Sequence, residues 1–271
     1  MELYLLLLVA GCLSGVLTIL FGFAGGFVVV PLVYTTIRLH TDAGSMANEL
    51  AFKSAIATSL LLMIINSALA SYQQYKKGKL KWPYIFPLAY WIAVGAALGT
   101  FASFYLSANF LKWAFVLYLV VTIVDCVFRQ IKHPQQQQES SARLLTTQER
   151  SVGGVIIGAV AAALGVGGSV MTVPLFRRCG LDMSSSVALA NPLSMPLAIA
   201  GTITFIVGYM FQPVVLGTHF IGYFYYPALL CLIVGGYIGM KIAGPWSNKL
   251  SNRTHERGYI VLLTLVLFSI L

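Results

Sequence analysis

Uninterrupted apolar stretches of about 20 residues recur along the whole chain, and as α-helices each would span the hydrocarbon core of a bilayer. Strands of a membrane β-barrel would instead show segments of about ten residues with alternating polarity. Of the 271 residues, 58% are hydrophobic and 9% are charged, which is more apolar surface than a soluble domain can bury. The sequence therefore predicts an all-α polytopic membrane protein that lies in the lipid bilayer of the cell (inner or plasma) membrane.

Some of these stretches are continuous and two are interrupted. Continuous spans are predicted at residues 51–72, 82–105, 110–128, 184–210, 219–243 and 252–271. The interrupted elements cover residues 3–37 and 151–176, and each contains a glycine cluster between two apolar runs. We expect each cluster to separate two half-helices, because glycine readily leaves helical geometry. Met1-Glu2 opens the chain without a basic region, so no cleaved signal peptide is expected.

The two glycine clusters are copies of one another. Residues 20–32 read LFGFAGGFVVVPL, and residues 164–175 read LGVGGSVMTVPL. A shift of 143 places superposes the glycines and prolines of the two copies: Gly22 on Gly165, Gly25 on Gly168, Pro31 on Pro174, Gly11 on Gly154 and Gly15 on Gly158. We therefore expect two membrane repeats, 1–128 and 151–271, joined by a hydrophilic linker at 129–150. Each repeat is expected to hold a broken, re-entrant first helix followed by three transmembrane helices.

Later spans also correspond between the repeats. At an offset of 133, Thr58-Ser59 falls on Asn191-Pro192. At an offset of 140, Gly95 and Gly99 fall on Gly235 and Gly239. Both of these glycine pairs have GxxxG spacing, which lets two helix backbones approach closely. We interpret these glycines as helix–helix contacts.

The basic residues predict how the repeats are oriented. Positive connections follow residues 51–72, 151–176 and 219–243, and they contain Lys76, Lys77, Lys79, Lys81, Arg177, Arg178, Lys241, Lys249 and Arg253. The connections at 106–110 and 211–218 carry no charge. If positive connections face the cytoplasm, each broken element enters and leaves on one side. The two repeats are then inverted, with both termini outside and the linker inside.

The glycine clusters are the predicted place for a ligand. Backbone freed from a helix inside a membrane is tolerated only when it is buried in protein or lines a watery cavity. The second half-helix of each element would point its free N–H groups and partial positive charge at the break, which suits an anion. The alternative is that the glycines only let helices cross tightly. The predicted binding residues at the clusters are Gly22, Gly25, Gly26, Gly165, Gly167, Gly168 and Ser169.

Small polar residues inside the spans extend this predicted site. Thr58, Ser59 and Asn191 occupy equivalent places in the two repeats, and neutral hydroxyl and amide groups can donate to an oxyanion. Their alternative role is to bond their own helix backbone. Lys53 is a candidate counter-charge for the anion. It could instead extend to the membrane interface or pair with Glu49.

Several other kinds of function are disfavoured. No His, Asp or Glu lies at the centre of a span, and the four cysteines have no metal-ligand spacing. We therefore expect no cofactor, no metal and no enzyme activity; Ser169 lacks a basic partner for nucleophilic catalysis. The net charge of +9 comes from residues in short connections, so it indicates membrane topology rather than nucleic-acid binding.

At these residues the chain resembles the sulfite exporter TauE/SafE family of membrane permeases. The resemblance lies in the doubled glycine element ending in Val-Pro-Leu and in the stretch from Lys53 to Ser59. It implies transport of small sulfur-containing anions, sulfite or organosulfonates, across a bacterial-type inner membrane. The site would comprise the two glycine breaks with Thr58, Ser59 and their counterparts. The second repeat departs from the first because it has Asn191-Pro192 where the first has Thr58-Ser59.

The predicted function is a secondary transporter, and an exporter, that moves such an anion by alternating access between the repeats. The alternative is a channel or permease for another small anion or solute. The sequence leaves the transported anion, the coupling ion and a homo-oligomeric state open.

Overall fold

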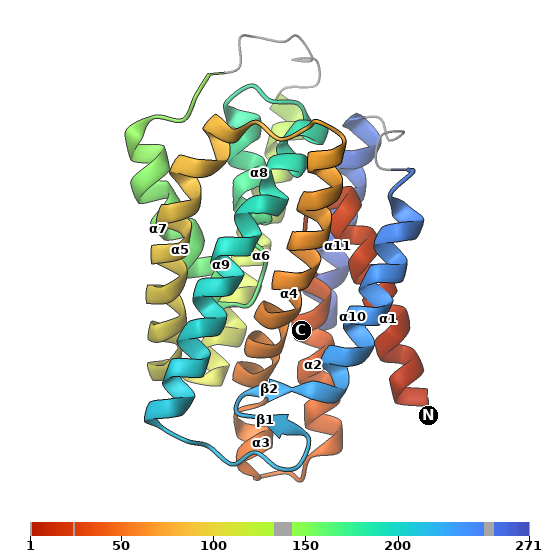
Figure 1. Cartoon of the computed structure of the whole chain (residues 1–271), viewed down its shortest axis with the longest axis vertical. Helices are drawn as coiled ribbons and strands as arrows, with labels where there is room; N and C mark the ends of the chain where they lie inside the picture. The colour runs from red at the N-terminus through yellow and green to blue at the C-terminus, as the bar shows by residue number, and fades with distance from the viewer. Residues whose placement is uncertain (1, 24, 133–142, 247–251, 271) are drawn as a thin grey trace.

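The computed structural model describes all residues except 1, 24, 133–142, 247–251 and 271. The chain forms a bundle of helices with one small β-hairpin (Figure 1). The elements are α1 (Glu2–Phe21), α2 (Gly26–His40), α3 (Met46–Glu49), α4 (Ala51–Lys76), α5 (Trp82–Tyr105), α6 (Ala108–Lys132), α7 (Thr147–Ala163), α8 (Ser169–Arg178), α9 (Met183–Phe211), β1 (Phe220–Ile221), β2 (Phe224–Tyr225), α10 (Tyr226–Ala243) and α11 (Asn252–Ile270).

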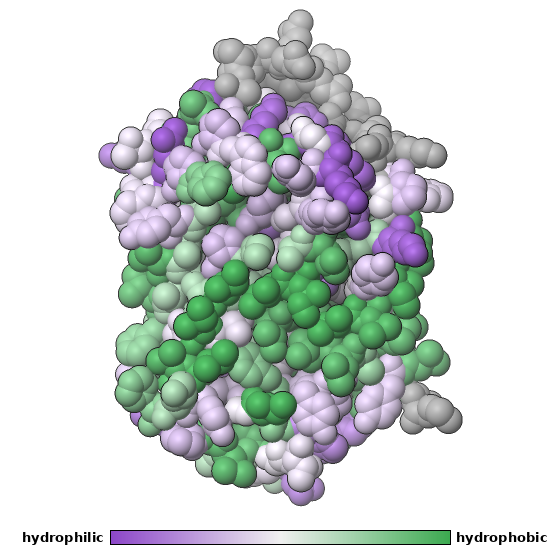
Figure 2. All heavy atoms as spheres, in the orientation of Figure 1, coloured by the Kyte–Doolittle hydropathy of each residue, from purple (hydrophilic) through white to green (hydrophobic). Residues whose placement is uncertain are grey.

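Six of the described helices are long and apolar enough to cross a membrane: α1, α4, α5, α6, α9 and α10. Their outward side chains are large and apolar, as with Leu5 on α1, Phe101 on α5 and Leu117 on α6. Figure 2 shows apolar residues gathered in a band across the middle of the molecule, with more hydrophilic residues above it. These findings confirm the predicted all-α polytopic membrane protein.

Both interrupted elements are helical hairpins. In Figure 1, α1 rises from the N-terminus to the middle of the bundle, and α2 returns to the end where α3 lies. α7 descends from the opposite end, and α8 returns to that end. A hydrogen bond from the N–H of Arg143, just before α7, to the carbonyl of Cys179, just after α8, joins the two arms (3.0 Å). The predicted breaks are therefore present near mid-bundle.

Glycines bring the first helix of each half against a helix of the other half. α1 packs along α10, and α7 packs along α5. A Cβ atom on Gly15 would collide with the carbonyl of Gly236, and one on Gly239 with the carbonyl of Cys12. In the other pair, a Cβ atom on Gly99 would collide with the carbonyl of Ala159. The interpretation of the GxxxG pairs as helix–helix contacts is confirmed, because no larger residue fits there.

The predicted span at 219–243 is wrong at its start. Residues 220–225 form the β1–β2 hairpin, in which Phe220 pairs with Tyr225. Gly222 has a φ of +60° in the two-residue turn, which favours a hairpin over a helix. Pro227, in the first turn of α10, has no N–H to lose at a helix start. The apolar run is thus divided between a hairpin and a helix.

The basic connections gather at the linker end of the bundle. Lys77 Nζ donates to the carbonyl of Gly244 (3.0 Å), and Lys79 Nζ donates to Ser184 Oγ (3.0 Å). Partial burial, with the charge of Lys79 beside it, lowers the pKa of Lys77. Arg178, at the end of α8, pairs with Asp125. Lys249 lies outside the described residues.

Candidate functional site

The first break separates α1 from α2 at residues 22–25. Gly22 and Gly25 have φ values of +76° and +92°, in the left-handed region that only glycine adopts readily. The N–H of Gly22 bonds to the carbonyl of Thr18, which closes the last turn of α1. Gly25 is the N-cap of α2, and its carbonyl accepts from Val28 and Val29. The glycines therefore end one helix and start the next within four residues.

The second break separates α7 from α8 and uses a different ending. Gly165 has a φ of +67°, its N–H bonds to the carbonyl of Ala162, and the N–H of Val166 bonds to the carbonyl of Ala161. This pair of bonds is the Schellman motif, which satisfies carbonyls left free at a helix end. Gly168, the N-cap of α8, keeps right-handed geometry with a φ of −57°.

The two breaks touch each other through their backbones. A Cβ atom on Gly26 would lie 2.6 Å from the carbonyl oxygen of Gly165, and one on Gly167 would lie 2.7 Å from the carbonyl oxygen of Phe23. Segments about 140 residues apart in sequence thus meet in the centre of the bundle. The N-termini of α2 and α8, each with a partial positive charge, begin at this junction.

Aromatic side chains surround the first break. Phe23 stacks on Tyr259 of α11 with ring centroids 4.9 Å apart, and it meets Phe27 edge-on at 5.0 Å. Tyr259 also donates its hydroxyl to the carbonyl of Val170 on α8 (3.5 Å). These buried rings hold α2, α8 and α11 together around the junction.

Among the predicted residues of α4, Ser59 lies directly at the junction. Its hydroxyl donates to the carbonyl of Gly165 (2.8 Å). Thr58 is buried beside it, but its hydroxyl donates to the carbonyl of Ser54 (2.7 Å) and accepts from the N–H of Tyr225 (2.9 Å). Thr58 therefore anchors the β1–β2 hairpin against α4, and both hydrogen-bonding roles of its hydroxyl are in use.

The predicted polar residues of the second repeat keep free hydrogen-bonding capacity. Asn191 donates to the carbonyl of Thr18 (3.4 Å), while its Oδ1 has no partner among the described residues. The Ser169 hydroxyl, at the start of α8, is fully buried and also has no partner in the described part of the chain. A polar atom buried without a partner is unfavourable, so such atoms mark places where a ligand can bind.

Lys53 lies away from the junction. Its ammonium donates to the carbonyl of Phe104 (2.8 Å), near the C-terminus of α5, where the helix dipole favours a cation. Glu49 is not its partner. Ser59 lies six residues further along α4, about 9 Å by helical rise. The structure thus gives Lys53 a helix-end partner that neither sequence-based interpretation foresaw.

Sequence reasoning missed two residues at the first break, Ser14 of α1 and Asn66 of α4. A Cβ atom on Gly25 would collide with Ser14 Oγ and would lie 3.0 Å from Asn66 Nδ2. Both side chains are buried. The available signal was weak: Asn66 is one of several polar residues in its span, and the residue 143 places after Ser14 is the apolar Ile157.

Few acidic residues belong to the helices that meet at the junction. α2, α4, α8, α9 and α10 contain no Asp or Glu, and α1 contains only Glu2, at its first position. α7 carries Glu149 at its linker end, fifteen positions before Leu164, and α11 carries Glu256, three positions before Tyr259. Among the described residues no group of three His, Cys, Asp or Glu side chains could hold a metal ion. The junction therefore combines helix N-termini with neutral polar groups, a combination suited to an anion.

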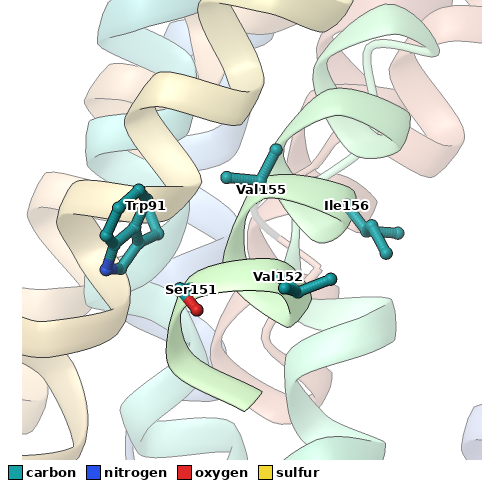
Figure 3. Close-up of a pocket in the computed structure, with 5 residues that line it drawn as sticks. All are labelled: Trp91, Ser151, Val152, Val155 and Ile156. Atoms are coloured by element: carbon teal, nitrogen blue, oxygen red, sulfur yellow. The ribbon is translucent and has the colours of Figure 1, made fainter. Parts of the chain in front are cut away.

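One apolar hollow lies elsewhere, between α5 and α7 (Figure 3). It is lined by Trp91, Ser151, Val152, Val155 and Ile156. These α7 residues precede the break at Leu164 by at least eight positions, about 12 Å of helix. The hollow is thus separate from the junction, and its lining offers little to a polar ligand.

Taken together, the fold and the junction define a multi-pass helical membrane protein with paired helix breaks in its core. The chain belongs to the sulfite exporter TauE/SafE family, which matches residues 7–270. This confirms the resemblance noted from the glycine elements. The family is one of membrane transporters rather than enzymes, so the protein is a membrane transporter.

Curated relatives agree with this assignment. A probable membrane transporter protein of Haemophilus influenzae is 26% identical, covering 97% of this chain and 96% of the relative. A probable membrane transporter protein of Methanocaldococcus jannaschii is 24% identical over 91% of this chain and 87% of the relative. A probable membrane transporter protein of Bacillus subtilis is 22% identical over 86% of each chain. No solved structure matches the chain significantly.

Proposed function

We propose that the protein is a secondary transporter that exports a small sulfur-containing anion, sulfite or an organosulfonate, by alternating access. The observation that supports this most is the meeting of two helix N-termini, α2 and α8, in a buried junction whose described polar side chains are neutral. Helix N-termini bind oxyanions through free N–H groups and a partial positive charge. The substrate class follows the description of the family to which the chain belongs.

The proposed site comprises the glycines of both breaks with Ser59, Ser169 and Asn191. Ser169 Oγ and Asn191 Oδ1 have no partner among the described residues, and the hydroxyl can donate to an anion oxygen. Thr58 contributes by holding the hairpin, since its hydroxyl is already bonded twice. Lys53 contributes by joining α4 to α5 rather than by touching the anion.

The proposed mechanism treats the halves 1–128 and 151–271 as inverted repeats. The hairpin α1–α2 opens toward one end of the bundle, and α7–α8 opens toward the other (Figure 1). α1 packs on α10 and α7 on α5, so each half holds the broken helix of the other. Rocking of one half against the other would expose the junction to each side in turn. The positive-inside rule applied to the basic connections supports a cytoplasmic position for the linker end.

A thermal-shift series tests the proposal. The purified protein in detergent is heated with sodium sulfite, thiosulfate, sulfoacetate, taurine or sulfate, with sodium chloride at equal ionic strength as the control. We expect sulfite or a sulfonate to raise the midpoint, because a ligand at 100 times its Kd stabilises the folded state by about 2.7 kcal/mol. Asn191→Ala should reduce that shift. Equal midpoints in all the salts would contradict the proposal.

A further inference from the structure

Two buried side chains with unpartnered polar atoms lie against the first break. Ser14 is 0% exposed and Asn66 is 1% exposed. Ser14 Oγ and both polar atoms of the Asn66 amide have no hydrogen-bond partner among the described residues. Ser14 Oγ lies so close to Gly25 that no Cβ atom could be added there. Two helices, α1 and α4, thus direct free polar groups at the residue that caps α2.

The Asn66 side chain lies between two glycines. A Cβ atom on Gly25 would lie 3.0 Å from its Nδ2, and one on Gly236 of α10 would lie 3.0 Å from its Oδ1. Larger residues at either glycine would crowd the amide. The glycines therefore leave room for a polar side chain whose apolar surroundings offer it no hydrogen bond. Burying the amide in this way costs free energy when no ligand is bound.

The equivalent place in the second break is apolar. Gly168 corresponds to Gly25, and a Cβ atom on Gly168 would meet Leu197 Cδ1 at 3.2 Å and Ile157 Cγ2 at 3.6 Å. Ile157 is the residue 143 places after Ser14. The unpartnered hydroxyl of this break, on Ser169, lies instead beside Gly167, where the breaks touch. The two breaks thus each end one helix and begin another, and they differ in the side chains that line them.

We propose that the charged oxyanion group of the ligand binds at the first break, where Ser14, Asn66 and the N-terminal amides of α2 hold it. The amides of Gly26 and Phe27 have no intrahelical partner, because they open the helix. The Ser14 hydroxyl and Asn66 Nδ2 add two donors, and the 15 residues of α2 add a positive dipole end.

This inference rests on the proposed function, because it takes the bound anion to be the transported one. Binding of sodium sulfite and sodium sulfoacetate to the full chain in detergent is measured by isothermal titration calorimetry. The variants are Ser14→Ala, Asn66→Ala and Asn66→Asp. Ser103→Ala is the matched control, since Ser103 is a buried serine on α5 whose hydroxyl already bonds to the carbonyl of Thr100.

We expect Ser14→Ala and Asn66→Ala each to weaken anion binding about 3- to 10-fold, the usual effect of one lost hydrogen bond. Asn66→Asp should weaken it at least about 100-fold, because a carboxylate then faces the anion. Ser103→Ala should bind like the wild type. Gel-filtration profiles identify any variant that fails to fold. The remaining variants at Ser14 and Asn66 still test whether these residues bind the anion.

Two results would overturn the inference while leaving the proposed function intact. The first is wild-type affinity in both Ser14→Ala and Asn66→Ala. The second is an Asn66→Asp variant that binds sulfite as tightly as the wild type, because the residue at position 66 would then not face the anion. If the wild-type protein bound neither sulfite nor sulfoacetate, the proposed function would fail, and the inference with it.

Discussion

The two helix breaks share glycine and proline positions but differ in their tolerance for a side chain. Gly25 caps α2 with a φ of +92° against Ser14 and Asn66, whereas Gly168 caps α8 with a φ of −57° against Leu197 and Ile157. The same glycine motif therefore provides a polar recess in one repeat and close apolar packing in the other. The difference shows that two copies of a glycine motif can each interrupt a helix while they differ in local backbone geometry and in the side chains that line them.

Away from the breaks the halves should behave alike, and this gives the largest expected effects. Gly15→Leu and Gly158→Leu each place a side chain against backbone, at the carbonyls of Gly236 and Ile92 respectively. We expect each variant to lose more than about 3 kcal/mol of stability, or to fail to fold. The leucine would have to push α1 away from α10, or α7 away from α5, because the backbones are in direct contact. Thermal unfolding in detergent measures the loss.

Gly153→Leu is the matched control for that pair. Gly153 lies in the same helix as Gly158, but no atom lies within 4 Å of a Cβ placed on it. We expect its unfolding midpoint to stay near that of the wild type. Strongly unequal losses of stability in Gly15→Leu and Gly158→Leu would show that the α1–α10 contact and the α7–α5 contact are not equivalent.

Alanine at the two N-cap glycines tests the contrast between the breaks directly. Gly25→Ala should cost about 2–4 kcal/mol, from left-handed backbone strain and the collision with Ser14 Oγ. Gly168→Ala should change stability by less than about 1 kcal/mol, because its backbone already suits alanine and its nearest neighbour is a flexible leucine tip. Similar losses in both variants would contradict the contrast.

Replacing Lys53 should lower the stability of the protein without weakening sulfite binding. Lys53→Gln shortens the side chain and breaks the hydrogen bond to the carbonyl of Phe104, so we expect a loss of about 1–2 kcal/mol. Sulfite affinity should stay within about twofold, since Lys53 precedes Ser59 by six residues of α4, about 9 Å of helical rise, and its ammonium bonds to α5. Lys81→Gln, in an exposed connection, is the control. A tenfold loss of affinity in Lys53→Gln would restore its role as a counter-charge.

The smallest effect concerns Glu149, at the linker end of α7. The Arg143 guanidinium, helped by the N–H of Thr146, lowers the pKa of the Glu149 carboxyl to about 2. A lowered folded-state pKa means that the carboxylate stabilises the protein above about pH 4.5 and that this is lost as pH falls toward 2. Glu149→Gln should cost up to about 1 kcal/mol at pH 7, because the pair is largely solvent-exposed.

A pH series checks this last expectation. The difference in unfolding midpoint between wild type and Glu149→Gln should shrink steadily as the pH falls from 5 toward 3. A difference that stayed constant over that range would contradict the role of the carboxylate.

Much of the fold could be predicted because lipid imposes simple rules. Long apolar runs must be helices, and clustered glycines at Gly22 and Gly165 broke two of them. The hairpin at 220–225 was not predicted, because its residues are as apolar as a span and only Gly222 marks the turn. A tertiary contact, the bond between Thr58 and the Tyr225 N–H, holds it in place.

Some of the residues at the junction could be predicted from the sequence, and others could not. The repeat located the glycines and Ser59 at the junction, because duplication makes such positions visible in sequence. Ser14 and Asn66 have no such signal, since their importance comes from convergence on Gly25 across α1 and α4. Convergence between helices depends on packing, which residue spacing alone does not specify.

Counterflow in proteoliposomes tests the central claim most directly. Vesicles containing the protein are loaded with unlabelled sulfite and diluted into a trace of radiolabelled sulfite, with empty vesicles as the control. Alternating access predicts transient accumulation of label above its outside concentration and saturation as sulfite rises. Flux that never saturates, with no counterflow and with electrical conductance far above carrier turnover, would show a channel and contradict the account.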